Sequence, residues 1–118
     1  MRIKQVEDML GIDRETVRFY IKEGLISPRQ DPNGYREYSD EDIKQLKKIL
    51  VMRDLEISIA DIRGICDGEV EFASALRTSE ELLSKKQAVL DNAIKACNEL
   101  RTLNSASFDP ERYFLRRS

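Results

Sequence analysis

The sequence contains no histidine, and this absence excludes whole classes of function. Histidine is the usual general base near neutral pH and the commonest metal ligand, so Ser-His-Asp and Cys-His catalytic arrangements are excluded. Neither a GxGxxG sequence nor a phosphate-binding P-loop sequence is present. We therefore expect a protein that is not an enzyme and that has no cofactor.

Long apolar runs are missing as well. No run approaches the roughly 18 apolar residues of a membrane-spanning helix, so we expect neither a membrane span nor a membrane partner. The first residues lack the apolar stretch of a secretory signal. The two cysteines, Cys66 and Cys97, are too few for a disulfide framework. These features together predict a cytoplasmic protein.

An excess of positive charge is also absent. The net charge is −2 over 118 residues, and residues 1–56 hold about as many acidic as basic side chains. Any nucleic-acid surface must therefore gather its cations locally on one face. The chain length allows one domain, or one small domain with an extension. The charged fraction of 36% indicates long exposed helical faces.

What is present begins with two short helices in the N-terminal part. The first has apolar residues at helical spacing and ends at Gly11. This spacing is carried by Ile3, Val6, Met9 and Leu10. Asp13 then starts the second helix, since aspartate at an N-cap accepts the free N–H groups of the first turn. Two helices joined by a glycine-containing turn predict a helix-turn-helix.

The second helix carries a row of cations. Arg14, Arg18 and Lys22 follow one another at i, i+4 and i+8, away from the apolar side formed by Val17, Tyr20 and Ile21. Such a row is either a solvated helix surface or a surface that contacts nucleic acid. The segment that follows favours nucleic acid, because it adds a second group of cationic and aromatic residues.

Residues 27–38 predict a β-hairpin. Asn33-Gly34 is a strong turn signal, because both residues tolerate positive φ. Strand alternation places Arg36 and Tyr38 on one face and Tyr35 on the other. The hairpin is either a solvated element that its tyrosines pin to the core, or a wing that lies against the phosphate backbone or minor groove.

Two further helices follow the hairpin. Ser39 and Asp42 form a capping box, and Ser58 starts a shorter helix that ends at Asp67-Gly68. The first of these helices has an apolar stripe that we expect to be buried, made of Ile43, Leu46, Ile49, Leu50 and Leu55. Its other side should be solvated, and it carries Lys44, Lys47 and Lys48.

A long helix is predicted after residue 68. No proline or glycine interrupts residues 69–103, and Thr78–Glu81 is either a helix start or part of a longer helix. A helix from Glu80 to Leu103 would span about 35 Å, too long to bury both of its apolar stripes on a small domain. It needs a partner helix, most simply that of a second copy; the alternative is an intramolecular fold-back. The residues expected to dimerise are Leu82, Leu83, Val89, Leu90, Ile94, Cys97 and Leu100.

The last residues predict one more helical turn. Asp109 and Pro110 read as an N-cap and a first helical position. The aromatic residues that follow, Tyr113 and Phe114, are frayed, dock on the body of the protein, or wall a small-molecule pocket.

These patterns together resemble the MerR-type transcription regulators. The resemblance runs from Ile3 to about Ile65. It is carried by Gly11-Ile12-Asp13, Thr16–Tyr20, Gly24-Leu25-Ile26, Pro28, Asn33–Ser39 and Ile57–Ile62. It implies a mainly α fold, with a winged helix-turn-helix, a small hairpin wing and an antiparallel coiled coil formed by the long helix. The implied domains are a DNA-binding domain over 1–68, a linker and dimerisation helix over 69–104, and a tail over 105–118.

The resemblance also implies a function. Family members act as homodimers on a pseudo-palindromic promoter element of double-stranded DNA. Activators of the family bend and untwist that element so that RNA polymerase can engage it, which makes polymerase an indirect partner. An unidentified small-molecule effector is a further expected partner.

Individual contacts follow from the matching positions. Arg18, Phe19 and Tyr20 should contact the DNA backbone or base edges, and Tyr35 and Arg36 should hold flanking phosphates. Helix geometry adds Arg14 to this set. Glu15 stands where the family often has a basic residue. It should either accept a hydrogen bond from cytosine N4 or pair with Arg18 or Arg14.

Other departures keep two alternatives open. Glu56 replaces a common glycine, and the two-cysteine loop of the metal-sensing members is absent. We expect no metal site and buried packing for Cys66 and Cys97, the commoner role of isolated cysteines. One alternative is a thiol- or metal-responsive sensor that uses these two cysteines. The other is an excisionase-like factor that shapes DNA without regulating transcription.

Overall fold

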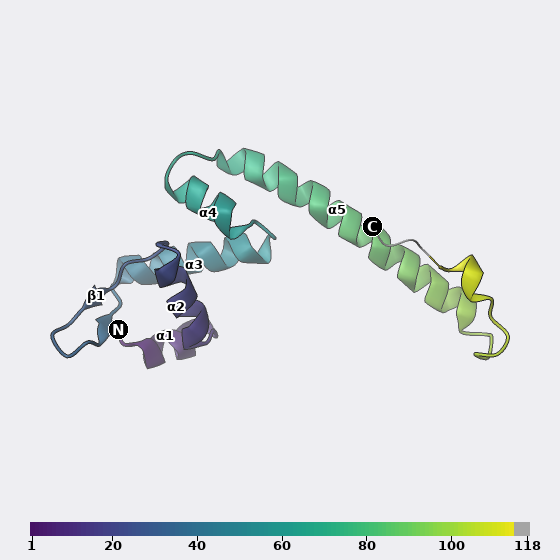
Figure 1. Cartoon of the computed structure of the whole chain (residues 1–118), viewed down its shortest axis with the longest axis horizontal. Helices are drawn as coiled ribbons and strands as arrows, with labels where there is room; N and C mark the ends of the chain where they lie inside the picture. The colour runs from purple at the N-terminus through teal and green to yellow at the C-terminus, as the bar shows by residue number, and fades with distance from the viewer. Residues whose placement is uncertain (115–118) are drawn as a thin grey trace. The chain divides into compact units, whose positions relative to one another are not determined.

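A computed structural model gives the fold, and it describes residues 1–114. The last four residues of the expected tail, 115–118, lie outside the described part. The chain divides into two compact units, Met1–Ser79 and Glu80–Ser118. The elements are α1 (Ile3–Leu10), α2 (Arg14–Lys22), β1 (Arg29–Gln30), β2 (Arg36–Glu37), α3 (Asp40–Asp54), α4 (Ile59–Cys66), α5 (Phe72–Leu100) and a 3-10 helix, Pro110–Arg112 (Figure 1). The predicted fold class, mainly helical with a two-stranded hairpin and a long C-terminal helix, is confirmed.

The helices begin where the sequence places their caps. The Asp13 carboxylate accepts a hydrogen bond from the Thr16 N–H at 2.8 Å, at the start of α2. Ser39 Oγ accepts from the Asp42 N–H at 3.1 Å, and Asp42 Oδ2 accepts from the Ser39 N–H at 2.9 Å, which completes the predicted capping box of α3. Ser58 caps α4 in the same way. These local contacts fix the helix boundaries of the first unit.

The core of the first unit lies between α1, α2, α3 and α4. Its fully buried side chains are Val6, Val17, Leu46, Ile49, Ile57 and Ile62. The first turns of α5 add Ala75 and Ser79, which are almost fully buried. Thr78–Glu81 therefore lies inside a longer helix rather than at its start. The boundaries proposed at residues 68 and 104 stay predictions.

The hairpin is short and its turn is held by one carboxylate. β1 and β2 pair antiparallel, with Arg29 opposite Glu37 and Gln30 opposite Arg36. Asp31 Oδ1 accepts from the Asn33 and Tyr35 N–H groups, both at 3.1 Å. Gly34 takes a φ of +86°, whereas Asn33 keeps a negative φ. The turn therefore differs from the two-residue form in which both central residues have positive φ.

The connection between α4 and α5 depends on a glycine. Gly64 is buried in α4, and a side chain at this position would collide with Val70 Cγ2. The Gly64 carbonyl accepts hydrogen bonds from the Glu69 and Val70 N–H groups at 2.8 and 3.0 Å. The chain can therefore turn closely around the end of α4 only where no Cβ is present.

The second unit contains most of α5 and the C-terminal turn. Asp109 caps the 3-10 helix, as the sequence predicts. Tyr113 Oη donates to Glu99 Oε2 at 3.1 Å, so this part of the tail docks on α5 (Figure 1). No helix among the described residues is long and apolar enough to cross a membrane.

Candidate nucleic-acid interface

The exposed surface of α2 carries most of the expected contact residues. Arg14, Glu15, Arg18 and Phe19 are all exposed. Tyr20 is different, because only 5% of it is exposed and its ring belongs to the core. It lies one helical turn from the buried Val17, on the apolar side of α2. This burial corrects the expectation that Tyr20 contacts DNA, and we remove it from the contact set.

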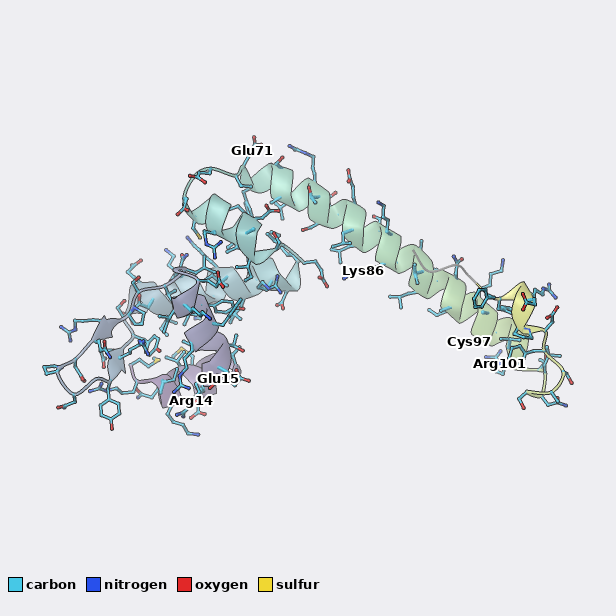
Figure 2. All side chains as sticks on the ribbon, viewed as in Figure 1. Arg14, Glu15, Glu71, Lys86, Cys97 and Arg101 are labelled. Carbon is cyan, nitrogen blue, oxygen red and sulfur yellow. The ribbon has the colours of Figure 1, made fainter. Side chains whose placement is uncertain are left out.

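The two arginines of α2 are already paired with acids. Arg18 Nη1 lies 2.9 Å from Glu15 Oε1, one of the alternatives that the sequence left open for Glu15. Arg14 Nη2 lies 2.8 Å from Glu7 Oε1, which comes from α1. The hydrogen bond from Arg14 holds the pKa of Glu7 below its usual value. Arg14 and Glu15 are adjacent at the start of α2 (Figure 2).

One tyrosine of the hairpin anchors it to the core, and the other is free to contact a ligand. Tyr38 is buried and anchors the hairpin to the core, whereas Tyr35 is 66% exposed. Arg36, on the same strand face as Tyr38, is half-buried and makes no ion pair with any residue of the described range. The exposed part that can reach a ligand is therefore Tyr35 together with the head of Arg36.

Charges of α2 and of the hairpin both act on Tyr38. Burial raises the pKa of the Tyr38 hydroxyl, and the charges of Arg36 and Arg18 partly oppose that rise. The Tyr38 hydroxyl therefore lies within the electrostatic reach of one cation from each element.

The sequence patterns did not indicate Arg2, which holds the hairpin in place. Its Nη1 lies 2.6 Å from Asp31 Oδ2, and its guanidinium carbon lies 5.6 Å from the centre of the Tyr35 ring. Arg2 thereby fixes both the turn carboxylate and the exposed aromatic ring. The pKa of Asp31 is lowered, first of all by this hydrogen bond. No local pattern signals this contact, because its partners are 29 residues apart.

Arg29 is a further cation of the hairpin that was missed. It is exposed on β1, opposite Glu37, and it lines a small polar hollow with Ser27, Ser39 and Asp42. β1 is only two residues long, so no alternation pattern could mark Arg29 as an exposed cation.

Arg63 of α4 fixes the end of α2. It donates to the Glu23 carbonyl oxygen at 3.3 Å and forms an ion pair with the Glu23 carboxylate. The C-terminal end of α2 is therefore tied to α4. No local pattern indicates this pair, since its members are 40 residues apart.

Both cysteines are exposed in the single chain, which corrects the expectation of buried packing for Cys66. Cys97 belongs to the expected dimerisation surface, so its packing stays a prediction. Cys66 Sγ accepts from Gln45 Nε2 at 3.2 Å. Cys97 lies near the C-terminal end of α5 (Figure 2). Within residues 1–114, no group of three or more Cys, Asp or Glu side chains comes together in a way that could hold a metal ion.

The predicted dimerisation residues form an open apolar surface. Five of these residues are large and between 38% and 65% exposed: Leu82, Leu83, Val89, Leu90 and Ile94. Cys97 is exposed and Leu100 is half-buried. Leu76, which shares a stripe with some of these residues, packs instead against the core of the first unit.

Comparison with known proteins identifies the architecture. The family model described as "MerR HTH family regulatory protein" matches residues 1–69. The chain is 30% identical over 106 residues to the HTH-type transcriptional activator mta of Bacillus subtilis (strain 168). That alignment covers 88% of this chain but 40% of mta, so the chain spans less than half of this relative. The name of this relative agrees with the prediction that the chain is not an enzyme.

Solved structures show the same fold. The N-terminal part of the B. subtilis multidrug transporter activator, MtaN, superimposes with a TM-score of 0.68 at 30% identity and covers 89% of this chain and 99% of its own. HiNmlR, a MerR family regulator lacking the sensor domain and bound to promoter DNA, gives a TM-score of 0.59 at 20% identity, with 86% and 93% covered. At that lower identity the likeness concerns the fold alone.

Proposed function

Because the chain belongs to the MerR family of helix-turn-helix regulatory proteins, we propose that it regulates transcription by binding promoter DNA as a homodimer. The observation that carries this proposal is that α2 and the hairpin both present exposed side chains suited to DNA, namely Arg18 and Phe19 on α2 and Tyr35 on the hairpin. Arg18 and the half-buried Arg36 add cations for the phosphate backbone, which determines most of the affinity for DNA. Since the target is chromosomal DNA, we place the protein in the cytoplasm.

The elements have separate roles in this proposal. α2 enters the major groove and the hairpin acts as a wing on the flanking backbone. Arg18 and Arg36 bind phosphates, while Phe19 and Tyr35 offer apolar rings to base edges or sugars. Arg14 contributes only if it exchanges Glu7 for a phosphate. Glu15 restrains Arg18 until DNA is bound.

Dimerisation rests on the apolar surface of α5. Complete burial of a large aliphatic side chain contributes about 1.5–3 kcal/mol, so a half-exposed one gains about 1 kcal/mol. Leu82, Leu83, Val89, Leu90 and Ile94 on each of two helices would then contribute about 10 kcal/mol before association costs. A Kd of 1 μM needs about 8 kcal/mol after association costs, so these side chains supply only part of the stability of an antiparallel coiled coil and its other contacts supply the rest. Such a dimer would hold two helix-turn-helix units at a fixed spacing. It would bend and untwist a pseudo-palindromic promoter element so that RNA polymerase can engage it.

A binding experiment tests the contact surface. Genomic fragments that the purified chain retains supply the DNA, and affinity is measured by fluorescence anisotropy. Arg18→Ala combined with Arg36→Ala should weaken binding at least tenfold, and binding should depend steeply on salt. The control Lys4→Ala removes one exposed cation from α1 and should change affinity little. Equal affinity of the double variant and the parent would refute the surface.

A sedimentation experiment tests the dimer. Leu90→Glu places a charge in the apolar surface and should convert the protein to a monomer at micromolar concentration. Ser84→Glu adds the same charge on the opposite side of α5 and should leave the dimer intact. If Leu90→Glu sediments like the parent, the proposed interface is wrong.

Transcription in vitro separates a regulator from an architectural factor. A regulator should change the amount of transcript from a retained promoter, whereas an excisionase-like factor should bend that DNA without changing the transcript. Replacing Cys66 and Cys97 by serine should leave either effect unaltered, unless the exposed thiols sense a metal or an oxidant.

A further inference from the structure

The outer surface of α3 carries a groove that the DNA-binding proposal does not use. It has a volume of about 540 Å³ and lies entirely within the first unit. Small-molecule sites in proteins typically measure about 300–1,000 Å³. The residues that line the groove come from α3, α4 and the start of α5: Lys44, Lys47, Lys48, Val51, Met52, Ile65 and Phe72.

The floor of this groove is apolar and open to water. Val51 is 57% exposed and Phe72 is 49% exposed, and neither belongs to the core. Met52 and Ile65 lie beneath them and belong to the core or pack against it. Exposed apolar side chains that gather in one concave place, rather than scattering, are typical of a binding site.

The rim of the groove is positively charged. Lys44, Lys47 and Lys48 occupy one side of α3 at helical spacing, and none forms an ion pair within the described chain. Lysine stems can lie along apolar surface while their ammonium groups stay in water. Three uncompensated positive charges beside an apolar floor attract an anion and repel a cation. In the first unit, Arg2, Arg14, Arg18 and Arg63 are each matched with a carboxylate, whereas the cations outside the groove that form no ion pair among residues 1–114, such as Lys22 and Arg36, do not border an apolar floor of this kind.

We propose that this groove binds a small amphipathic anion, a molecule with a carboxylate or sulfonate head and an aliphatic or aromatic body. The body lies on Val51 and Phe72, and the head lies among the ammonium groups of α3. The charge of the rim selects the anionic head, and the apolar floor selects the body. This site shares no residue with the proposed DNA surface, so the two proposals can be tested independently.

Titration of the full chain with decanoate tests this proposal. Methyl NMR signals of Val51, Met52 and Ile65 should shift and saturate together, well below the concentration at which decanoate forms micelles. Decyltrimethylammonium has an equal chain and the opposite charge, and it should bind at least tenfold more weakly. If the two compounds bind equally well, or if the shifts fall on Leu90 and its neighbours in α5 instead, the groove is not the site.

Two variants test the groove itself. Replacing Lys44, Lys47 and Lys48 together by glutamine should raise the Kd for decanoate at least tenfold, and Val51→Asp should do the same by placing a carboxylate on the floor. Lys4→Gln removes one exposed cation from α1 and should leave the Kd unchanged. Because all the replaced side chains are exposed, thermal melting should show that the variants fold. Unchanged decanoate binding in both groove variants, or groove methyl signals that do not respond because a second copy or another protein segment already covers them, would overturn the proposal.

Discussion

Replacing Glu15 by glutamine should strengthen DNA binding, because Glu15 competes with DNA for Arg18. Their ion pair measures 2.9 Å, but the side chains of Arg18 and Glu15 are 58% and 75% exposed. An exposed pair of this kind is worth about 0–1 kcal/mol, so its loss should barely change the stability of the fold. Glu15→Gln therefore separates the effect on DNA from any effect on folding.

The size of the gain follows from counterion release. One further phosphate contact makes the slope of log K against log salt steeper by about 0.9. Extrapolated from 1 M salt, that slope corresponds to about fivefold tighter binding at 0.15 M and about fifteenfold at 0.05 M. The predicted gain must therefore grow as salt is lowered, which a general change in stability would not produce.

The assay is anisotropy on one duplex over a range of salt concentrations. Glu81→Gln, in the second unit, removes the same charge from an exposed position and should leave the slope unchanged. If Glu15→Gln binds more weakly, and the loss disappears when one C·G pair is replaced, Glu15 reads cytosine N4 instead. An unchanged slope would show that Arg18 gains no phosphate, and either result refutes the competition.

Three further predictions concern the stability of the first unit. Glu56 has a φ of +66°, a backbone conformation that only glycine adopts without strain. The free energy of unfolding in urea should therefore be about 0.5–1 kcal/mol higher for Glu56→Gly than for Glu56→Ala. Gly64→Ala should cost about 1–3 kcal/mol by collision with Val70, and a second change, Val70→Ala, should restore part of it. Arg14 lowers the pKa of Glu7 from 4.5, so this contribution to stability is complete above pH 4.5 and disappears as the pH falls through the lowered pKa. As the pH is lowered from 6 to below the pKa of Glu7, the melting temperature of Glu7→Gln should therefore fall less than that of the parent protein.

Those features of the fold that depend on neighbouring residues could be predicted from the sequence. Asp13, Ser39 and Ser58 each cap a helix by accepting an N–H three residues ahead, so both partners lie in one short pattern. Contacts between distant segments could not be predicted in this way. The pairs Arg2–Asp31 and Glu23–Arg63 join separate elements, and no spacing in the sequence connects them.

The candidate site shows the same division. Motif resemblance selects Phe19 and Tyr20 together, but it does not distinguish an exposed ring from a buried one. Helical periodicity does, because Tyr20 lies three residues from the buried Val17 and points to the core. The usual burial of isolated cysteines fails for Cys66, because its exposure depends on what packs over α4.

The pairing of charges on α2 bears on what the proposed dimer would contribute to DNA binding. Arg14 and Arg18 are each held by an acid, so Lys22 and Arg36 are the cations of α2 and β2 that form no ion pair within the described chain. Two phosphate contacts correspond to about thirtyfold in affinity at 0.15 M salt, and four correspond to about a thousandfold. One copy alone would therefore bind DNA weakly, and its affinity would grow only if DNA displaced Glu7 and Glu15. In the proposed dimer, joining two copies through α5 would make the second contact intramolecular, which would raise the affinity without adding cations to either copy.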